Sequence, residues 1–310
     1  MTFGLQCDEP LSRRILDRAV AGGITFLDTS DVYPLGGTAE TVGRTEEILG
    51  RWMAGRRHEV VVATKCFGAT GPRPWDRGLS RRHVLDAIDA SLRRLQTDYV
   101  DLYQAHHPDP DTPIDETLRA FDDVVRAGKA RYVGCSNYSA WQTARALGRS
   151  DLLGLARFET VQPRYNLLFR QIERELLPFC AEEGLAVIPY NPIAGGLLSG
   201  KHRLDRGPAA GTRFTLGTAA RRYQERYWHE REFETVEAVR GLAAEAGMSM
   251  VQLAVAWVLA NPVITAPIVG ASRPEQLDDV LAAAGKRLDP ALKGRLDRLT
   301  ADYRLGDDPR

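Results

Sequence analysis

The sequence has no excess of charge of either sign and no long uninterrupted apolar run. Its 41 Lys and Arg residues balance 41 Asp and Glu residues, which argues against a nucleic-acid-binding protein, because such proteins usually show a clear basic excess. No stretch approaches the roughly 18 consecutive apolar residues of a membrane-spanning helix. The opening residues, MTFGLQCDEP, lack the basic segment followed by an apolar one that marks a signal peptide. We therefore expect a cytoplasmic protein that binds neither nucleic acid nor membrane.

Cysteine is scarce, with four residues far apart and no C-x-x-C pair or adjacent His. This spacing predicts neither a disulfide framework nor a metal site, and it fits a reducing compartment. We interpret each as a small core residue: Cys7, Cys66, Cys135 and Cys180.

Nucleotide-binding glycine motifs are also missing. No G-x-G-x-x-G follows an apolar run, so a Rossmann cofactor site has no support. Gly195–Lys201 reads G-x-x-x-x-G-K, but His202 stands where a Walker A motif has Ser or Thr. The motif also leads into a loop rather than a helix, so we expect no ATP site.

What the chain does have is a regular series of short β-rich apolar runs. With 310 residues, 44% of them hydrophobic and 26% charged, it has a globular composition. Several runs are continuous rather than alternating, as in parallel strands that are covered on both faces. The predicted strands are Ile24–Thr29, Val60–Cys66, Tyr99–His106, Ala130–Ser136, Phe158–Gln162, Leu185–Tyr190 and Thr265–Gly270.

Amphipathic segments with helix start and stop signals lie between these runs. Ser80 is placed to cap one helix, and Gly128 and Gly184 to close two others. The predicted helices are Ser12–Ala21, Thr38–Met53, Ser80–Leu95, Ile114–Ala127, Ala140–Leu147, Ile172–Glu183, Glu232–Ala246, Val251–Leu259 and Arg273–Ala283.

Strict alternation of strand and helix implies parallel strands with right-handed crossovers. No linker divides the chain, so we predict one α/β domain over residues 1–310, a (β/α)8 TIM barrel, whose usual size is roughly 250 residues or more. An eighth strand would have to precede Ser12, where Met1–Phe3 offers only a stub. The first strand is therefore expected to be short or truncated.

Candidate catalytic side chains follow successive predicted strands. FLDTSDVYP brings Asp28 to a strand end and Tyr33 onto the following loop. ATKC places Lys65 at the end of the next strand, and YQAHHPD brings His106 to the end of the one after. Barrel enzymes place their chemistry at the carboxyl ends of the strands. We therefore expect these four side chains to meet.

Together they suggest a carbonyl reductase site. A phenol has a reference pKa of about 10 and is a poor acid at neutral pH. An ammonium group nearby favours phenolate, and a carboxylate keeps that ammonium charged and oriented. In this interpretation Tyr33 donates the proton, Lys65 tunes it, Asp28 orients Lys65, and His106 is a second carbonyl-facing group.

These motifs resemble the aldo-keto reductase superfamily, in particular its bacterial and potassium-channel-β-like branches. The resemblance runs from about Thr25 to Ala283 through DTSDVY, DYVDLYQAHHPD, GKARYVGCSN, VQPRYNLL, NPIAGGLLSGK and VGASRPEQL. It implies an NADPH-dependent oxidoreductase that binds its cofactor without a Rossmann domain and passes hydride to an aldehyde or ketone. Nucleotide-linked keto-sugars are among the candidate substrates. Within LYQ-x-H-x-P the resemblance assigns the catalytic role to His106 and a place in the substrate pocket to His107, with the reverse assignment left open.

The cofactor residues carry over by the same resemblance. Ser136, Asn137 and Gln162 match contacts to the nicotinamide carboxamide, and Tyr190 matches the aromatic that stacks on the ring, with ordinary packing as its alternative. At the adenosine-phosphate end, Val280 stands where several relatives have Asn. The remaining matches are Asn191, Pro192, Ile193, Ala194, Gly195, Lys201 and Arg213 for the pyrophosphate, and Gly270, Ser272, Arg273, Gln276 and Asp279 for the adenosine phosphate.

Three features leave alternatives open. The long Lys201–Arg231 stretch, with Trp228, is either a lid over cofactor and substrate or a solvated loop, and Trp75 is either a pocket wall or a loop anchor. The rival function is an NADPH-binding regulatory or redox-sensing subunit with slow turnover, for which we would expect an added N-terminal segment. The preferred reaction direction and a homo-oligomeric state stay open as well.

Overall fold

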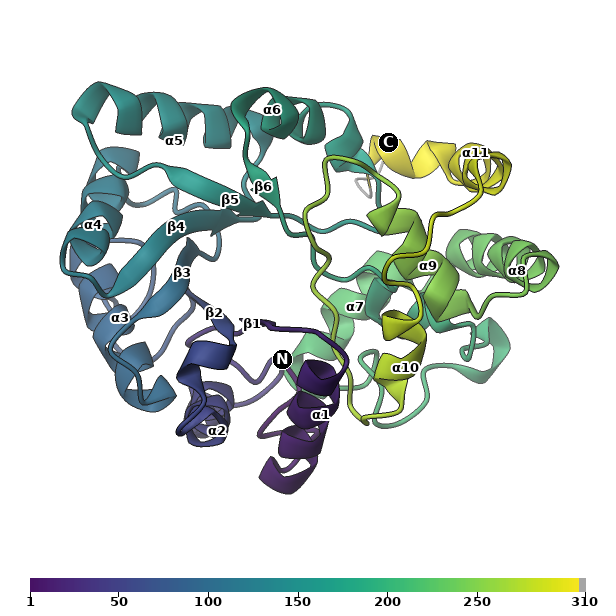
Figure 1. Cartoon of the computed structure of the whole chain (residues 1–310), viewed down its shortest axis with the longest axis horizontal. Coiled ribbons are helices and arrows are strands. Elements are labelled where there is room, and N and C mark those ends of the chain that lie inside the picture. Colours follow the sequence, from purple (N-terminus) through teal and green to yellow (C-terminus); the bar gives the residue numbers. More distant parts are fainter. Residues whose placement is uncertain (307–310) are drawn as a thin grey trace. The chain divides into compact units, whose positions relative to one another are not determined.

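The computed structural model describes residues 1–306. These residues form two compact units, one made of Met1–Gln162 with Gly270–Pro274 and the other of Pro163–Val269 with the chain from Glu275 onward. Figure 1 labels the helices and strands of both. The expectation of one domain over residues 1–310 stays a prediction and extends past the described part of the chain.

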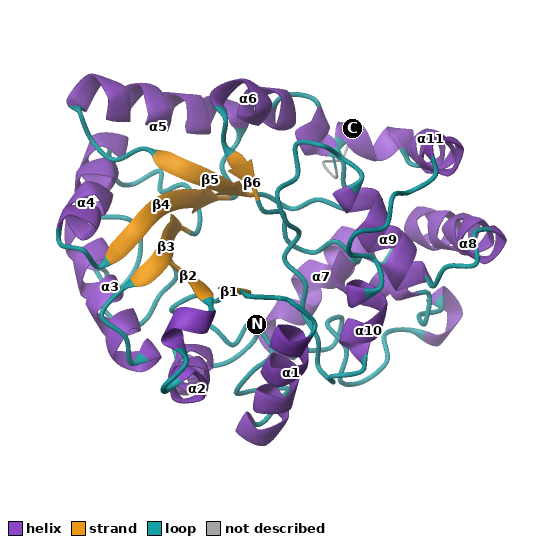
Figure 2. Cartoon of the chain, viewed as in Figure 1, coloured by secondary structure: helices purple, strands orange, loops and turns teal. Residues whose placement is uncertain are grey.

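A parallel sheet forms the centre of the first unit. Its strands pair in chain order, as expected when each strand is followed by a helix that returns the chain to the same end of the sheet. Figure 2 shows the strands in orange. They are β1 (Phe26–Asp28), β2 (Val61–Cys66), β3 (Val100–Ala105), β4 (Ala130–Ser136) and β5 (Phe158–Gln162).

The helices of this unit lie outside the curved sheet (Figure 2). An aromatic cluster joins the two layers: Phe121 of α4 packs 5.1 Å from Tyr103 of β3 and 5.9 Å from Phe158 of β5, ring centre to ring centre. The predicted cap is confirmed, since the Ser80 side chain accepts from the His83 N–H. The helices are α1 (Glu9–Ala21), α2 (Arg44–Met53), α3 (Arg81–Leu95), α4 (Ile114–Arg126) and α5 (Ala140–Leu153).

The second unit is mainly helical. Its short strand β6 (Ala186–Val187) is followed by isolated parallel bridges, Val187 with Ile264 and Tyr190 with Ile268. No single helix within residues 1–306 is long and apolar enough to cross a membrane, and the junction of α8 and α9 is bent by 91°. The helices are α6 (Leu176–Glu183), α7 (Ala220–Tyr227), α8 (Glu230–Glu245), α9 (Met250–Leu259), α10 (Gln276–Leu281) and α11 (Pro290–Leu299).

The late strands are shorter than the sequence predicts, and proline explains why. Pro189 and Pro267 lie inside the runs expected as Leu185–Tyr190 and Thr265–Gly270, and a residue without an N–H cannot continue a ladder. Near the N-terminus, the expected stub forms only one bridge, between Phe3 and Cys7. None of the four cysteines forms a disulfide and all four are fully buried, which confirms their interpretation as core residues.

Several helix predictions need correction. The helix expected over Thr38–Met53 is interrupted at Gly43, whose φ of 81° is not helical, and α2 begins at the next residue. The stretch Lys201–Arg231 is not irregular throughout, because it contains α7. Helix α11 was not predicted, although Pro290 occupies its first turn and Asp289 caps it by accepting from the Leu292 N–H.

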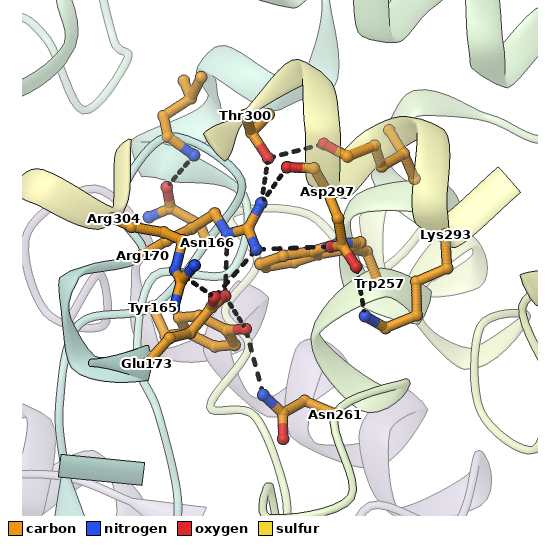
Figure 3. A network of polar contacts seen from close by, with 12 residues as sticks. Tyr165, Asn166, Arg170, Glu173, Trp257, Asn261, Lys293, Asp297, Thr300 and Arg304 are labelled. Atoms are coloured by element: carbon orange, nitrogen blue, oxygen red, sulfur yellow. Dashed lines mark hydrogen bonds and ion pairs between the residues drawn. The ribbon is translucent and has the colours of Figure 1, made fainter. Parts of the chain in front are cut away.

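A buried polar network ties the C-terminal helix to the rest of the second unit (Figure 3). The Arg170 guanidinium donates to both carboxylate oxygens of Glu173, at 2.8 and 2.9 Å. Its remaining nitrogen donates to the Asp297 carbonyl and the Thr300 hydroxyl, both at 2.8 Å. Trp257 of α9 donates to the Asp297 carboxylate at 2.8 Å. One side chain thus connects three segments that are distant in sequence.

Replacing Arg170 by Met should therefore destabilise the protein strongly. The variant leaves Glu173 and Asp297 without their shared partner, and breaking a buried ion pair costs about 3–5 kcal/mol. Urea unfolding should show a lower midpoint at unchanged slope. Arg221→Met is the matched control, because Arg221 pairs with Glu225 in solvent and its loss should change the midpoint little. Equal midpoints for the two variants would contradict the role assigned to the network.

Candidate active site

The carboxyl ends of β1 and β2 place a buried ion pair at one edge of the sheet. Lys65 is completely buried and donates from Nζ to Asp28 Oδ2 at 2.5 Å and to the Thr29 carbonyl at 2.7 Å. The strands are in parallel register, with Asp28 opposite Ala63, so the side chain of Lys65 reaches back to the end of β1. A buried ammonium needs such a partner to stay charged.

Two amides hold the other oxygen of the carboxylate, and one of them was not predicted as a site residue. Gln104 Nε2 donates to Asp28 Oδ1 at 3.2 Å and Gln162 Nε2 donates to the same atom at 2.8 Å. Gln162 was predicted only as a nicotinamide contact. The sequence signal for Gln104 was an amide near the carboxyl end of the predicted strand, two residues before His106. Asp28 is therefore fixed in position by three donors.

The structure brings the other two predicted catalytic residues to the same place. Lys65 Nζ lies 5.4 Å from the centre of the Tyr33 ring, and the Tyr33 and His106 rings meet edge to face with centres 5.8 Å apart. His107 stacks on His106 with centres 5.3 Å apart and also faces Phe67 at 5.4 Å. Tyr33 is 6% exposed, so its ring is held by packing.

Residues predicted to bind the nicotinamide carboxamide follow the ends of β4 and β5. Ser136 Oγ donates to the Gln162 carbonyl at 2.7 Å and accepts from Asn137 Nδ2 at 3.0 Å. Asn137 Nδ2 also donates to the His106 carbonyl at 2.9 Å, and its φ is +63°. Asn tolerates this left-handed conformation better than most residues. The chain of bonds links these side chains to the segment that carries His106.

The segment predicted to meet the adenosine phosphate is also anchored in the first unit. Thr2 Oγ1 donates to the carbonyl of Ala271 at 3.2 Å, next to Gly270, and the Cys7 thiol lies 3.6 Å from the Ser272 carbonyl. Arg273 is exposed. The helix expected over Arg273–Ala283 starts only at Gln276 and has six residues. Arg273 therefore precedes the helix and is not part of its first turn.

In the second unit, the predicted pyrophosphate segment forms a tight loop. Asn191 and Ala194 have positive φ angles of 66° and 51°, followed by Gly195 at 68°. The Gly195 N–H donates to Asn191 Oδ1 at 2.6 Å, and Asn191 Nδ2 donates to the Tyr227 hydroxyl at 2.9 Å. A Cβ on Gly195 would lie 2.6 Å from the Tyr223 ring, so only glycine fits.

Two of the predicted phosphate-binding side chains are cationic residues that follow this loop in the chain, and one of them is near it in space: a Cβ on Gly195 would lie 3.6 Å from Arg213 Cγ. Arg213 is near the Tyr223 ring, 5.5 Å from its centre, and its Nη1 is buried without a hydrogen-bond partner among residues 1–306. A buried unsatisfied donor of this kind is suited to an anion. Lys201 is exposed, and the neighbouring His202 imidazole is buried, which lowers its pKa to about 4.

The other predicted residues are placed as follows. Tyr190 is bridged to Arg164, and burial raises the pKa of its phenol. Trp228 packs against Phe214 and Phe233, with ring centres 4.9 Å apart in each case. The Arg82 guanidinium covers the ring of Trp75 at 4.7 Å, and that indole is 43% exposed. Within the second unit Pro192 is buried, Ile193 and Gln276 are half-buried, and Asp279 is exposed.

The buried Lys–Asp pair, with a tyrosine and a histidine beside it, lies in a chain that matches a known family over most of its length. The model of the aldo/keto reductase family matches residues 1–301. The chain belongs to the aldo/keto reductase family. Family membership makes it an oxidoreductase by class and implies a (β/α)8 barrel, with which the parallel strands and outer helices of the first unit agree.

Relatives of this aldo/keto reductase include proteins described in different ways. An uncharacterized oxidoreductase, YrpG, of Bacillus subtilis is 40% identical over 93% of this chain and 86% of its own length. A probable voltage-gated potassium channel subunit beta of Arabidopsis thaliana is 37% identical over 91% of this chain and 84% of its own length. The L-glyceraldehyde 3-phosphate reductase of Escherichia coli O157:H7 is 34% identical over 87% and 78% respectively.

Proposed function

We propose that this aldo/keto reductase is an NADPH-dependent enzyme that reduces small aldehydes or ketones to alcohols. The observation that carries the proposal is the fully buried Lys65 ammonium, 2.5 Å from the Asp28 carboxylate and 5.4 Å from the centre of the Tyr33 ring. A buried cation beside a phenol stabilises the phenolate that remains when the proton has been given away. This is the electrostatic requirement for a tyrosine that acts as a general acid.

The protein's part in the reaction follows from these contacts. Tyr33 donates its proton to the carbonyl oxygen, and Lys65 stabilises the resulting phenolate. Asp28 keeps Lys65 charged, while Gln104 and Gln162 keep the carboxylate oriented. His106 donates a hydrogen bond to the same carbonyl oxygen, and His107, stacked on it, borders the substrate. The cofactor, when bound, supplies the hydride.

The residues present fit a nicotinamide cofactor. In the first unit, Ser136, Asn137 and Gln162 would bind the carboxamide and Gly270, Ser272 and Arg273 the adenosine phosphate. In the second unit the buried Nη1 of Arg213 and the close approach at Gly195 suit a pyrophosphate. Tyr190 would stack on the nicotinamide, and the further proposed contacts are Asn191, Pro192, Ile193, Ala194, Lys201, Gln276 and Asp279.

A panel of aldehydes, ketones and keto-sugars assayed by loss of NADPH absorbance tests this function. The proposal expects NADPH oxidation that depends on at least one carbonyl, with turnover on the order of 1 s⁻¹ or faster, as is typical of enzymes. The similarity to channel β subunits favours a second candidate, a slow NADPH-binding regulatory subunit. Tight NADPH binding with turnover far below that range would favour the second candidate, and no NADPH binding would contradict both.

Arg273→Ala should weaken the preference for NADPH over NADH. A charge-assisted hydrogen bond to the 2′-phosphate contributes about 1.5–3 kcal/mol, so the Kd for NADPH should rise about ten- to a hundredfold. The Kd for NADH, which lacks that phosphate, should not change. Arg14→Ala, another exposed arginine of the first unit, is the control. An unchanged ratio of the two constants would remove Arg273 from phosphate recognition.

A further inference from the structure

A single hydroxyl connects His106 to a buried carboxyl that the proposed chemistry does not use. Ser30 Oγ lies 3.1 Å from His106 Nδ1 and 3.1 Å from Asp31 Oδ1. Ser30 and Asp31 are both completely buried and stand between Asp28 and Tyr33 in the chain. The backbone keeps them there, since the Asp31 N–H donates to the Lys65 carbonyl at 3.1 Å. The carboxyl is therefore one hydroxyl away from the imidazole.

The surroundings of Asp31 favour its neutral form. Asp31 Oδ2 has no hydrogen-bond partner in the described part of the chain. Burial raises the pKa of this carboxyl to about 8, with a further contribution from the Glu46 carboxylate, while the Arg94 guanidinium and the Ser30 hydrogen bond oppose the shift. Cys66 and Tyr103 also face Asp31, and burial raises the pKa of each, so both stay neutral.

Ser30 Oγ also has a longer contact, 3.4 Å to the Lys65 carbonyl. When its single proton points along the shorter contacts, the relay from Asp31 through Ser30 to His106 has two arrangements. When Asp31 is protonated, its O–H donates to Ser30 Oγ, and Ser30 donates to the lone pair of His106 Nδ1. Neutral His106 then carries its proton on Nε2. When Asp31 is ionised, Ser30 donates to the carboxylate, because a hydrogen bond to a charged acceptor is the stronger one. His106 Nδ1 must then carry the proton to bond Ser30.

We propose that Asp31, acting through Ser30, sets the tautomer of His106 and keeps its Nε2–H available to donate to the carbonyl oxygen. Asp31 and Ser30 are positioning residues, because the hydrogen bonds end at His106 and not at the substrate. The consequence for catalysis rests on the proposed function, but the tautomer itself does not. Tyr33 and His107, whose rings contact the His106 ring, are unchanged by substitutions at Asp31.

The test is the tautomer of His106, measured by long-range ¹H–¹⁵N NMR on the full-length protein with ¹⁵N-labelled histidine. His106→Asn assigns its signals among the six histidines. In the wild-type protein we expect neutral His106 to take the Nε2–H form below about pH 8 and the Nδ1–H form above it. In Asp31→Asn the side-chain amide donates to Ser30 in place of the acid, so Nε2–H should persist to about pH 10.

Two further variants test whether the tautomer of His106 depends on Asp31 through Ser30, rather than on any substitution near the site. Ser30→Ala removes the connecting hydroxyl, so the tautomer should no longer follow the titration of Asp31. Glu46→Gln removes the like charge that raises the pKa of Asp31, so the midpoint of the transition should move to lower pH. Each readout is a chemical shift in a folded protein and needs no turnover.

Activity gives an independent measure. The wild-type kcat for carbonyl reduction should fall above about pH 8, and Asp31→Asn should lose this alkaline limb with KM unchanged. A His106 tautomer that is the same at both ends of the pH range, or a wild-type transition in Asp31→Asn, would overturn the proposal. Absence of carbonyl reduction with the NMR transition intact would instead contradict the proposed function alone.

Discussion

Lys65→Met is expected to abolish carbonyl reduction and to destabilise the protein. The Lys65 ammonium lies beside both Asp28 and the Tyr33 ring, where it can stabilise a phenolate. The general acid it supports contributes typically about 10²–10⁴-fold in rate. Its removal also leaves the Asp28 carboxylate, 6% exposed, with only the two glutamine amides. An uncompensated buried charge of this kind costs about 3–5 kcal/mol. Both kcat and the urea midpoint should fall.

A second variant keeps this prediction testable if Lys65→Met folds poorly. The double variant Asp28→Asn, Lys65→Met replaces the ion pair by two neutral groups of similar size, which is often close to neutral for stability. We expect the urea midpoint to recover in the double variant while kcat stays low. Recovery of both would mean that Lys65 acts only through stability. Wild-type turnover in Lys65→Met would contradict its role in proton donation.

Tyr33→Phe is expected to lower kcat by about 10²–10⁴-fold at saturating NADPH, because it removes the proton donor and keeps the ring. The ring keeps its edge contact with His106 and its place beside Lys65. Folding and the Kd for NADPH, measured by fluorescence titration, should therefore stay close to wild type. The loss should lie in kcat rather than KM, as for an interaction made only in the transition state.

Tyr132→Phe is the matched control for that variant. Tyr132 lies on β4, is 62% exposed and loses the same hydroxyl. Its turnover should equal that of the wild-type protein. A Tyr33→Phe variant that matched Tyr132→Phe in kcat would show that another group donates the proton.

The elements best predicted from the sequence are those whose signal is local. The predicted ranges of β2, β4 and β5 differ from the structure by at most one residue, because short β-rich runs between helical segments indicate strands directly. The strands expected over Leu185–Tyr190 and Thr265–Gly270 are shorter in the structure, because Pro189 and Pro267 lack the backbone N–H that a continuous ladder of hydrogen bonds needs. Helix α7 has the amphipathic pattern of ARRYQERY, but its highly polar composition resembles that of a loop.

Within the site, the ends of the strands were predictable and their polar partners were not. Asp28, Lys65 and His106 each end or follow an apolar run, and Tyr33 comes shortly after the first. Gln104 reaches Asp28 from β3, and Ser30 reaches His106 across 76 residues of sequence. Such contacts depend on which strands are neighbours and in which register, and spacing along the chain does not contain that information.

The central claim is that hydride passes from NADPH to a carbonyl carbon, and isotope transfer tests it most directly. The full-length protein is incubated with NADPH deuterated at the transferable C4 position and with the best carbonyl of the panel. The account predicts an alcohol that carries deuterium on the former carbonyl carbon and a hydroxyl proton from Tyr33 and solvent, with far slower formation in Tyr33→Phe. An alcohol without deuterium, or equal rates in both proteins, would contradict it.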